Sequence, residues 1–155
     1  MKRLLFVFIL IFPMIVFGQD VTQNAVHEIP KHYSALPNLY NFNAVMKEQL
    51  SDKIIRQYVM GATSMLVKWT LKKDAVIALH FHPNEQVTWI TKGSVKVLSQ
   101  GKEFIVKAGE VLIIPPYVPH EFHALQDTID IDFFTPVRED WLNNTANYLQ
   151  NVRKQ

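Results

Sequence analysis

Residues 80–93 read HFHPNEQVTWITKG, and residues 109–120 read GEVLIIPPYVPH. His80 and His82 stand two residues apart, so in a strand both imidazoles point to the same face, about 6.6 Å apart along the chain. Gln86 follows a turn, at the start of the next run, where its amide oxygen can reach the same point. The second stretch is a glycine turn, an apolar run and a proline-rich turn that ends in His120. The two stretches therefore predict nitrogen and oxygen donors that converge.

Each of these residues has a simpler explanation when it is taken alone. A lone histidine is usually structural, and His120 would then only satisfy backbone groups of its proline-rich loop. Glu85 is one residue away from Gln86, so strand alternation turns it to the opposite face. His123 lies three residues beyond His120 and is not needed for a complete site, so we expect an ordinary structural histidine there.

The surrounding sequence predicts many short strands. Runs rich in Val, Ile, Trp and Thr are bounded by Gly, Asn, Pro or charged residues, which is typical of strands joined by tight turns. A sandwich or a closed jelly roll would protect the edges of such strands. Residues 99–102 predict a hairpin turn in which Gly101 takes a positive φ. Helical spacing covers residues 139–152, and a short helix fits residues 43–50. The expected strands are 54–60, 64–71, 75–81, 86–91, 95–99, 103–106, 111–114 and 128–134.

Length and composition place the chain among single globular domains. Its 155 residues suit one domain, and 48% hydrophobic residues are enough for a core. The chain has no cysteine, which excludes disulfides, zinc–thiolate sites, iron–sulfur clusters and a thiol nucleophile.

The first residues have the pattern of an export signal. Lys2 and Arg3 precede fourteen uncharged residues, 4–17, and Gly18–Gln19 offers a cleavage site. The alternative to cleavage is an uncleaved membrane anchor. A membrane span needs about 20 apolar residues, and this run is shorter, so we expect cleavage. Without residues 1–18 the chain has 14 basic and 14 acidic residues, which gives no basis for nucleic-acid binding or stable membrane association. We expect a secreted or periplasmic protein that depends on packing or a metal for stability.

The two quoted stretches resemble the paired motifs of the cupin superfamily, over about residues 60–136. The first motif is HxH, then Glu or Gln, then Gly, and the second is Gly, then Pro, then His. The resemblance implies an all-β fold, the double-stranded β-helix or jelly-roll barrel, with one divalent metal ion held inside. The implied ligands are His80, His82, Gln86 and His120. The matching residues are His80, His82, Gln86, Gly93, Gly109, Pro115 and His120.

The donor set and the fold together lead to three further expectations. Imidazole and amide donors suit several divalent ions, so we expect Ni, Mn, Fe, Zn or Co. All the donors are neutral, which leaves the charge of the ion uncompensated and favours an anionic ligand. The chain should divide into a signal peptide (1–18), an irregular N-terminal segment (19–50), the cupin barrel (51–138) and a C-terminal helix (139–155).

Residues 130–141, DIDFFTPVREDW, form a third informative stretch. Alternation puts Asp130, Asp132 and Phe134 on one face of a strand. That face is either the barrel interior, where two carboxylates approach the metal, or the surface of an edge strand, since buried carboxylates are costly.

Arg138 also has two interpretations. It either folds over the barrel mouth, where a guanidinium can bind a substrate carboxylate, or forms a surface ion pair with Glu139 or Asp140. The stretch resembles the end of the KdgF type of pectin-degradation protein, a small cupin that opens the ring of 4,5-unsaturated uronates. The resemblance implies that Asp132, Phe134 and Arg138 line the site beside the metal.

These expectations combine into one hypothesis, a metal-dependent cupin that converts unsaturated uronates to their linear keto form. In it Arg138 binds the sugar carboxylate, Asp132 moves a proton, and Phe134 packs against the sugar. The alternatives are a non-catalytic cupin that binds metal or carbohydrate, and an iron-dependent dioxygenase with the same ligands. The expected partner is a small sugar acid, and strand edges offer a route to a homodimer.

Overall fold

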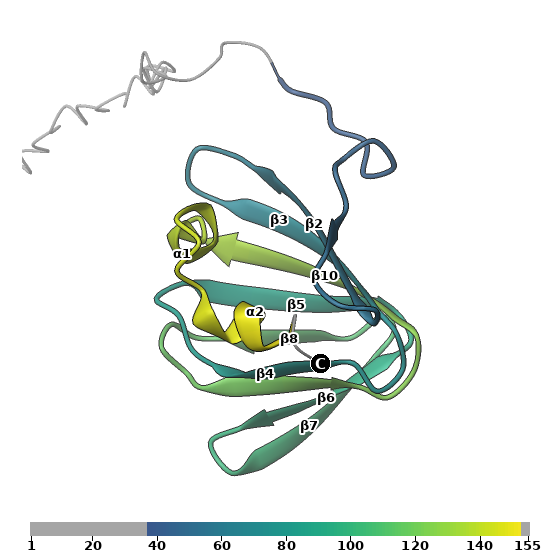
Figure 1. Cartoon of the computed structure of the whole chain (residues 1–155). Helices are drawn as coiled ribbons and strands as arrows, with labels where there is room; N and C mark the ends of the chain where they lie inside the picture. The colour runs from purple at the N-terminus through teal and green to yellow at the C-terminus, as the bar shows by residue number, and fades with distance from the viewer. Residues whose placement is uncertain (1–36, 153–155) are drawn as a thin grey trace, which may run out of the picture. The chain divides into compact units, whose positions relative to one another are not determined.

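The computed structural model describes residues 37–152, in which ten strands form two antiparallel sheets (Figure 1). The larger sheet has the order β1-β2-β3-β10-β5-β8 and the smaller one β4-β9-β6-β7. This is the predicted all-β architecture; the predicted signal peptide lies outside the described residues. The strands are β1 (Glu48–Gln49), β2 (Ile54–Met60), β3 (Met65–Leu71), β4 (Val76–His80), β5 (Glu85–Lys92), β6 (Ser94–Ser99), β7 (Lys102–Lys107), β8 (Val111–Ile114), β9 (His120–Ala124) and β10 (Thr128–Thr135).

Strand alternation builds the core from the inner faces of the strands. On β3, Met65, Val67, Trp69 and Leu71 are at most 2% exposed, while the residues between them are half-buried. Burial of each such apolar side chain stabilises the fold by about 1.5–3 kcal/mol. β10 alternates in the same way and pairs with β3 on one side and β5 on the other. β10 is therefore a central strand, and its inner face lies in the core.

Two segments differ from the sequence-based expectation among the strands. Residues 43–50 form a turn followed by β1 instead of a helix. The buried side chain of Gln57 fixes this path, because its amide donates to the carbonyls of Phe42 and Val45 at 2.6 and 2.8 Å. The sequence also missed β9, which pairs with both β4 and β6.

The predicted C-terminal helix is divided into two short helices, α1 (Glu139–Leu142) and α2 (Asn147–Val152). The interruption falls at Asn144, whose φ of 56° is left-handed, a conformation that asparagine adopts at helix ends. α2 lies against β4 (Figure 1). Within residues 37–152, neither helix has the length and apolar character that a bilayer crossing requires.

Glycine is required at the turn between β5 and β6. Gly93 has φ +78°, and a Cβ there would lie 2.5 Å from the carbonyl oxygen of Asp127. Gly101, in the predicted hairpin turn, also has positive φ (+74°), but a Cβ there would meet open space. The hairpin prediction is confirmed. Substitutions at the two glycines can be compared to separate the cost of backbone strain from that of steric overlap.

We expect Gly93→Ala to destabilise the fold by at least ~2 kcal/mol more than Gly101→Ala. Both variants bear the left-handed backbone cost of about 1–2 kcal/mol, and only Gly93→Ala adds the backbone overlap. Urea unfolding of the two variants measures the difference in free energy. Equal losses would contradict the close approach of Asp127 to Gly93.

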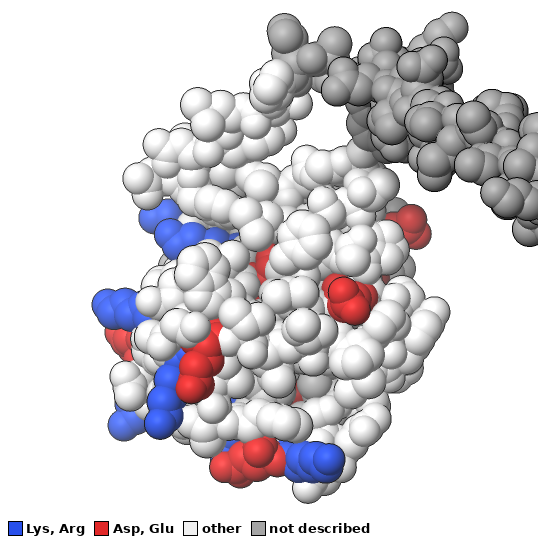
Figure 2. Space-filling view, turned by 180° about the vertical axis from the view of Figure 1, so that it is seen from behind, with Lys and Arg blue, Asp and Glu red and all other residues white. Residues whose placement is uncertain are grey.

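Charged side chains are distributed without segregation over the face drawn in Figure 2. Basic and acidic residues lie beside one another there, and much of the described part of this face is uncharged. A continuous basic surface of the kind that binds nucleic acid is not formed on the described part of that face.

Candidate metal centre

Three histidines converge at one end of the smaller sheet. His80 is the last residue of β4 and pairs with His120, the first residue of β9. His82 lies in the turn after β4, so the strand alternation expected for it is wrong, although the turn still brings its ring within 5.7 Å of the His80 ring. One ligand atom from each of the three residues lies within 4.8 Å of the others. The structure therefore brings these three predicted ligands together.

The backbone fixes the tautomer of all three imidazoles. Each Nδ1 lies beside a backbone carbonyl, which only accepts hydrogen bonds, so Nδ1 carries the proton and Nε2 keeps its lone pair. Burial lowers the pKa of His80 to about 2 and that of His82 to about 4, and it also lowers the pKa of His120. The rings are thus neutral at pH 7, and the buried Nε2 of His120 has no hydrogen-bond partner. The Nδ1 contacts are His80–Ala78 at 2.8 Å, His82–Asn84 at 3.1 Å and His120–Val118 at 2.8 Å.

Gln86 on β5 presents its amide oxygen to the same point. Its amide nitrogen donates to Thr88 Oγ1 at 2.9 Å and to Asp132 Oδ1 at 3.0 Å, which fixes the orientation of the amide. The oxygen then faces His82 Nε2 at 3.1 Å. Two acceptors so close repel each other unless a proton or a cation lies between them, and the low pKa of His82 disfavours the proton. Two ligands at right angles, about 2.1 Å from one ion, lie about 3 Å apart, so these residues fit a divalent metal.

Asp132 lies directly behind Gln86. Its carboxylate accepts hydrogen bonds from Trp69 Nε1 at 2.8 Å, Gln86 Nε2 at 3.0 Å and Thr88 Oγ1 at 2.6 Å. Burial raises the pKa of Asp132 to about 6, and these three bonds oppose the rise. The four proposed donors are neutral, and the carboxyl group of Asp132 stands one hydrogen bond behind Gln86.

The inner face of β10 carries the three predicted residues into the interior. Asp130, Asp132 and Phe134 are at most 3% exposed, and the alternative of an edge-strand surface is wrong because β10 is central. Phe134 lies edge-on to the His82 ring, with 5.5 Å between the ring centroids. Oδ1 of Asp130 is buried without a hydrogen-bond partner, and burial together with the charge of Asp132 raises its pKa well above 3.8.

We expect Asp130→Asn to gain stability over the natural chain as the pH rises from about 4 to about 8. The raised pKa means that the folded state binds more protons than the unfolded state above pH 3.8, so stability is lost as the pH rises through that window. Asparagine does not titrate, and its advantage at about pH 8 should reach at least ~1.4 kcal/mol, the value of a tenfold change in proton affinity. Urea unfolding of metal-free protein across this range measures it.

Asp127→Asn is the matched control, and its expected change in stability at neutral pH has the opposite sign. Asp127 is exposed, and the backbone N–H of Lys73 and the ammonium of Lys72 lower its pKa. Its carboxylate therefore stabilises the fold above pH 3.8, and the variant should lose stability at neutral pH. If both variants shifted in the same direction, the assignment for Asp130 would be overturned.

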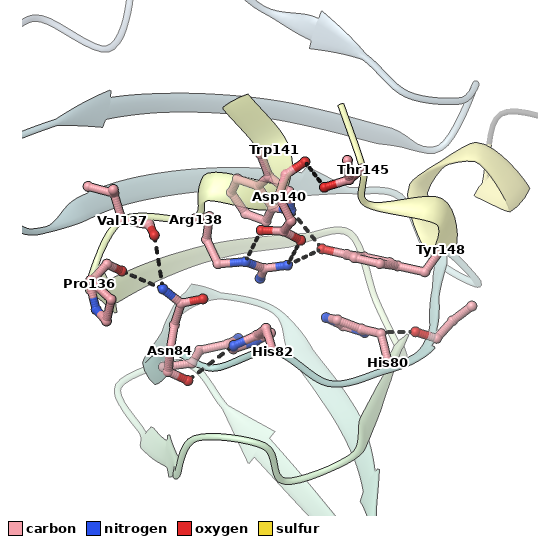
Figure 3. Close-up of polar contacts among 12 residues, drawn as sticks. His80, His82, Asn84, Pro136, Val137, Arg138, Asp140, Trp141, Thr145 and Tyr148 are labelled. Carbon is pink, nitrogen blue, oxygen red and sulfur yellow. Dashed lines mark hydrogen bonds and ion pairs between the residues drawn. The ribbon is translucent and has the colours of Figure 1, made fainter. Parts of the chain in front are cut away.

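Arg138 follows β10 and is fully buried. The predicted ion pair with Asp140 is present, with the guanidinium buried and the Asp140 side chain 30% exposed. Nε and Nη2 donate to the two carboxylate oxygens at 2.9 and 2.7 Å (Figure 3). Nη2 also donates to the hydroxyl of Tyr148 at 2.9 Å, and Nη1 is buried without a partner. Asn84 ties the histidine turn to this segment by donating to the carbonyls of Pro136 and Val137 at 2.6 and 3.1 Å.

The residues that were expected to lie outside the site do so. Glu85 is exposed, as strand alternation requires. His123 lies on β9 with its Nε2 2.6 Å from a carboxylate oxygen of Glu121. The sequence analysis missed Tyr148, which stacks on the His80 ring with 3.9 Å between centroids and 12° between planes. No spacing rule links residues 80 and 148, because a helix that follows the barrel brings them together.

Comparison with known proteins agrees with this geometry. Residues 67–135 match the family model of the cupin domain. The pectin degradation protein KdgF of Dickeya dadantii (strain 3937) is 29% identical over 98 residues, which cover 61% of this chain and 89% of that protein. The predicted likeness to cupins of the KdgF type is therefore confirmed.

Two solved structures share the fold. An RmlC-like cupin from Shewanella frigidimarina NCIMB 400 has a TM-score of 0.63 and 27% identity, covering 68% of this chain and 96% of the other. KdgF from Halomonas sp. has a TM-score of 0.63 and 23% identity, covering 67% of this chain and 99% of the other. Both confirm the jelly-roll fold.

Proposed function

Since residues 67–135 form a cupin domain whose three imidazoles converge beside a buried arginine, we propose that the protein is a metal-dependent cupin that opens the ring of 4,5-unsaturated uronates. One observation carries the proposal: a single internal cavity brings together a metal donor, a carboxylate and a guanidinium. The degradation of pectin by the Dickeya relative supports the choice of a uronate. The lining includes His80, Gln86, Asp132, Phe134 and Arg138.

The bound ion would be Ni, Mn, Fe, Zn or Co, held by His80, His82, His120 and Gln86. When bound, such an ion acts as a Lewis acid toward ligand oxygens. Asp132 fixes the amide of Gln86 by a 3.0 Å hydrogen bond, so the oxygen donor is oriented before the ion arrives.

The reaction is an isomerisation in which no atom is lost. The C1 hydroxyl gives up its proton, the bond between C1 and the ring oxygen breaks to leave an aldehyde, and the enol at C5 takes a proton at C4 to become a ketone. Asp132 would accept and return the proton. Arg138 would bind the sugar carboxylate, and Phe134 would pack against the sugar and exclude water.

The place of the reaction is also part of the proposal. We propose that the chain is exported, on the basis of Lys2, Arg3 and the uncharged residues 4–17. The protein would then meet lyase products in the periplasm or outside the cell.

A direct assay tests the activity. Lyase-generated unsaturated uronate is incubated with metal-loaded protein, and loss of the conjugated alkene absorbance is followed. We expect the rate to exceed that in buffer and to scale with metal content. No acceleration by fully loaded protein would overturn the proposed activity.

A second candidate is a non-catalytic cupin that binds metal or carbohydrate. The small volume of the cavity, about 10 Å³, favours its metal-binding form, because that space holds about one water molecule. Binding of uronate without turnover would support this candidate, and oxygen consumption in the same assay would indicate the dioxygenase.

A further inference from the structure

Two buried N–H donors converge on the hydroxyl of Tyr148. Arg138 Nη2 and Trp141 Nε1 each lie 2.9 Å from Tyr148 Oη (Figure 3). Arg138 is fully buried and Trp141 is 5% exposed, so water has little access to these donors. Two N–H groups directed at one oxygen form an arrangement that also suits a carboxylate oxygen.

A third donor beside these two has no partner. Nη1 of Arg138 is buried and makes no hydrogen bond. Asp140 accepts hydrogen bonds from Nε and Nη2 along one edge of the guanidinium, which fixes the plane of the group. One carboxylate oxygen can therefore replace Tyr148 Oη between Nη2 and Trp141 Nε1 while the other accepts from Nη1.

We propose that Arg138 and Trp141 form a carboxylate subsite, and that the hydroxyl of Tyr148 occupies it until an acid ligand displaces it. The inference rests on the proposed function for the class of acid, which is a uronate. Trp141 and Tyr148 are then specificity-determining residues, since they favour an acidic sugar over a neutral one.

Tyr148 also separates two spaces of different size. The internal cavity beneath it has about 10 Å³, and the pocket outside has about 690 Å³. Only the second reaches the several hundred Å³ typical of ligand sites. Tyr148 and His80 line both spaces and stack on each other. Displacement of Tyr148 would therefore open the subsite to the pocket that His80 and His82 already line.

The helix that carries Tyr148 is short. α2 has 6 residues, and a helix of that length is not stable in water without tertiary packing. Among its side chains that the structure describes, Leu149 is buried and Tyr148 packs against the core. The exposed residues 143–145 lie between it and α1. The position of α2 therefore depends on these packing contacts.

The test measures binding of D-galacturonate and of neutral D-galactose by calorimetry, with metal-loaded protein. Tyr148→Phe keeps the stacking ring and removes the hydroxyl, which leaves Arg138 and Trp141 without an acceptor in the free protein. We expect it to bind galacturonate about 5–10-fold more tightly than the natural chain, with galactose unchanged. Adding Trp141→Phe to that variant should reverse the gain. Unchanged or weaker galacturonate binding by Tyr148→Phe would overturn the proposal.

Indole N–H resonances give a readout in the natural chain. The Trp141 signal, assigned by its loss in Trp141→Phe, should shift with galacturonate and not with galactose. The exposed Trp89 is the internal control, and an unmoved Trp141 signal would also overturn the subsite. If galacturonate binds as expected while the unsaturated uronate is not opened, the proposed activity fails and the subsite stands.

Discussion

Replacement of His120 by alanine should abolish stable metal binding. The affinity should fall by more than the roughly 100-fold that loss of a ligand's hydrogen-bond partner causes. The reason is that His120 is fully buried, its Nδ1 is committed to the Val118 carbonyl, and its Nε2 has no other partner. Elemental analysis after dialysis measures the loss, with the natural chain expected to keep one ion per molecule.

His123→Ala is the matched control for this loss. His123 lies on the same strand, is half-buried and pairs with Glu121, away from the three ligands. This variant should keep its metal. Added metal at 100 times the dissociation constant should stabilise it and the natural chain by about 2.7 kcal/mol, and His120→Ala by nothing. Full metal content in a cooperatively folded His120→Ala protein would refute the proposed centre.

The second large effect is expected at Asp132. Asp132→Asn should lower turnover of the unsaturated uronate by about 10²–10⁴-fold, the usual contribution of a positioned acid or base. An amide neither accepts nor returns the proton, and its NH₂ group would meet the N–H donors of Gln86 or Trp69. The rate is measured at saturating metal, with metal content determined in the same sample.

Trp69→Phe is the control that separates the role of Asp132 in proton transfer from the orientation of its carboxylate. This variant removes the 2.8 Å hydrogen bond to Asp132 and keeps the carboxylate. We expect a loss of at most about 150-fold, the upper value of one hydrogen bond to a charged group. Turnover by Asp132→Asn at the natural rate would place the proton transfer on another group.

The sequence predicted the strands and the donors well because their signals are local. Alternation put Asp130, Asp132 and Phe134 on one face, and the structure buries all three. The prediction that the histidines converge is confirmed, but strand alternation, the reason given for it, is wrong for His82. His82 reaches the centre from a turn, and the contact of Nδ1 with the Asn84 carbonyl holds it there at 3.1 Å. Periodicity describes strands and does not describe such turns.

The sequence did not reveal the outer part of the site, because non-local packing creates it. Spacing suggested a surface pair for Arg138 and Asp140, yet Arg138 is fully buried beneath Tyr148 and Trp141. Tyr148 reaches Arg138 from α2, which lies against β4 and follows a break at Asn144 that the helical pattern did not show. Neither the break nor the docking leaves a periodic signal.

The donors of the proposed centre come from both sheets. Three imidazoles stand on or beside the strands of the smaller sheet, and the amide of Gln86 stands on the larger one. A bound ion would thus cross-link the two sheets at the open end of the barrel. In a chain with no cysteine, this coordination would do what a disulfide does in other proteins, and a chelator would make that end of the barrel susceptible to proteases.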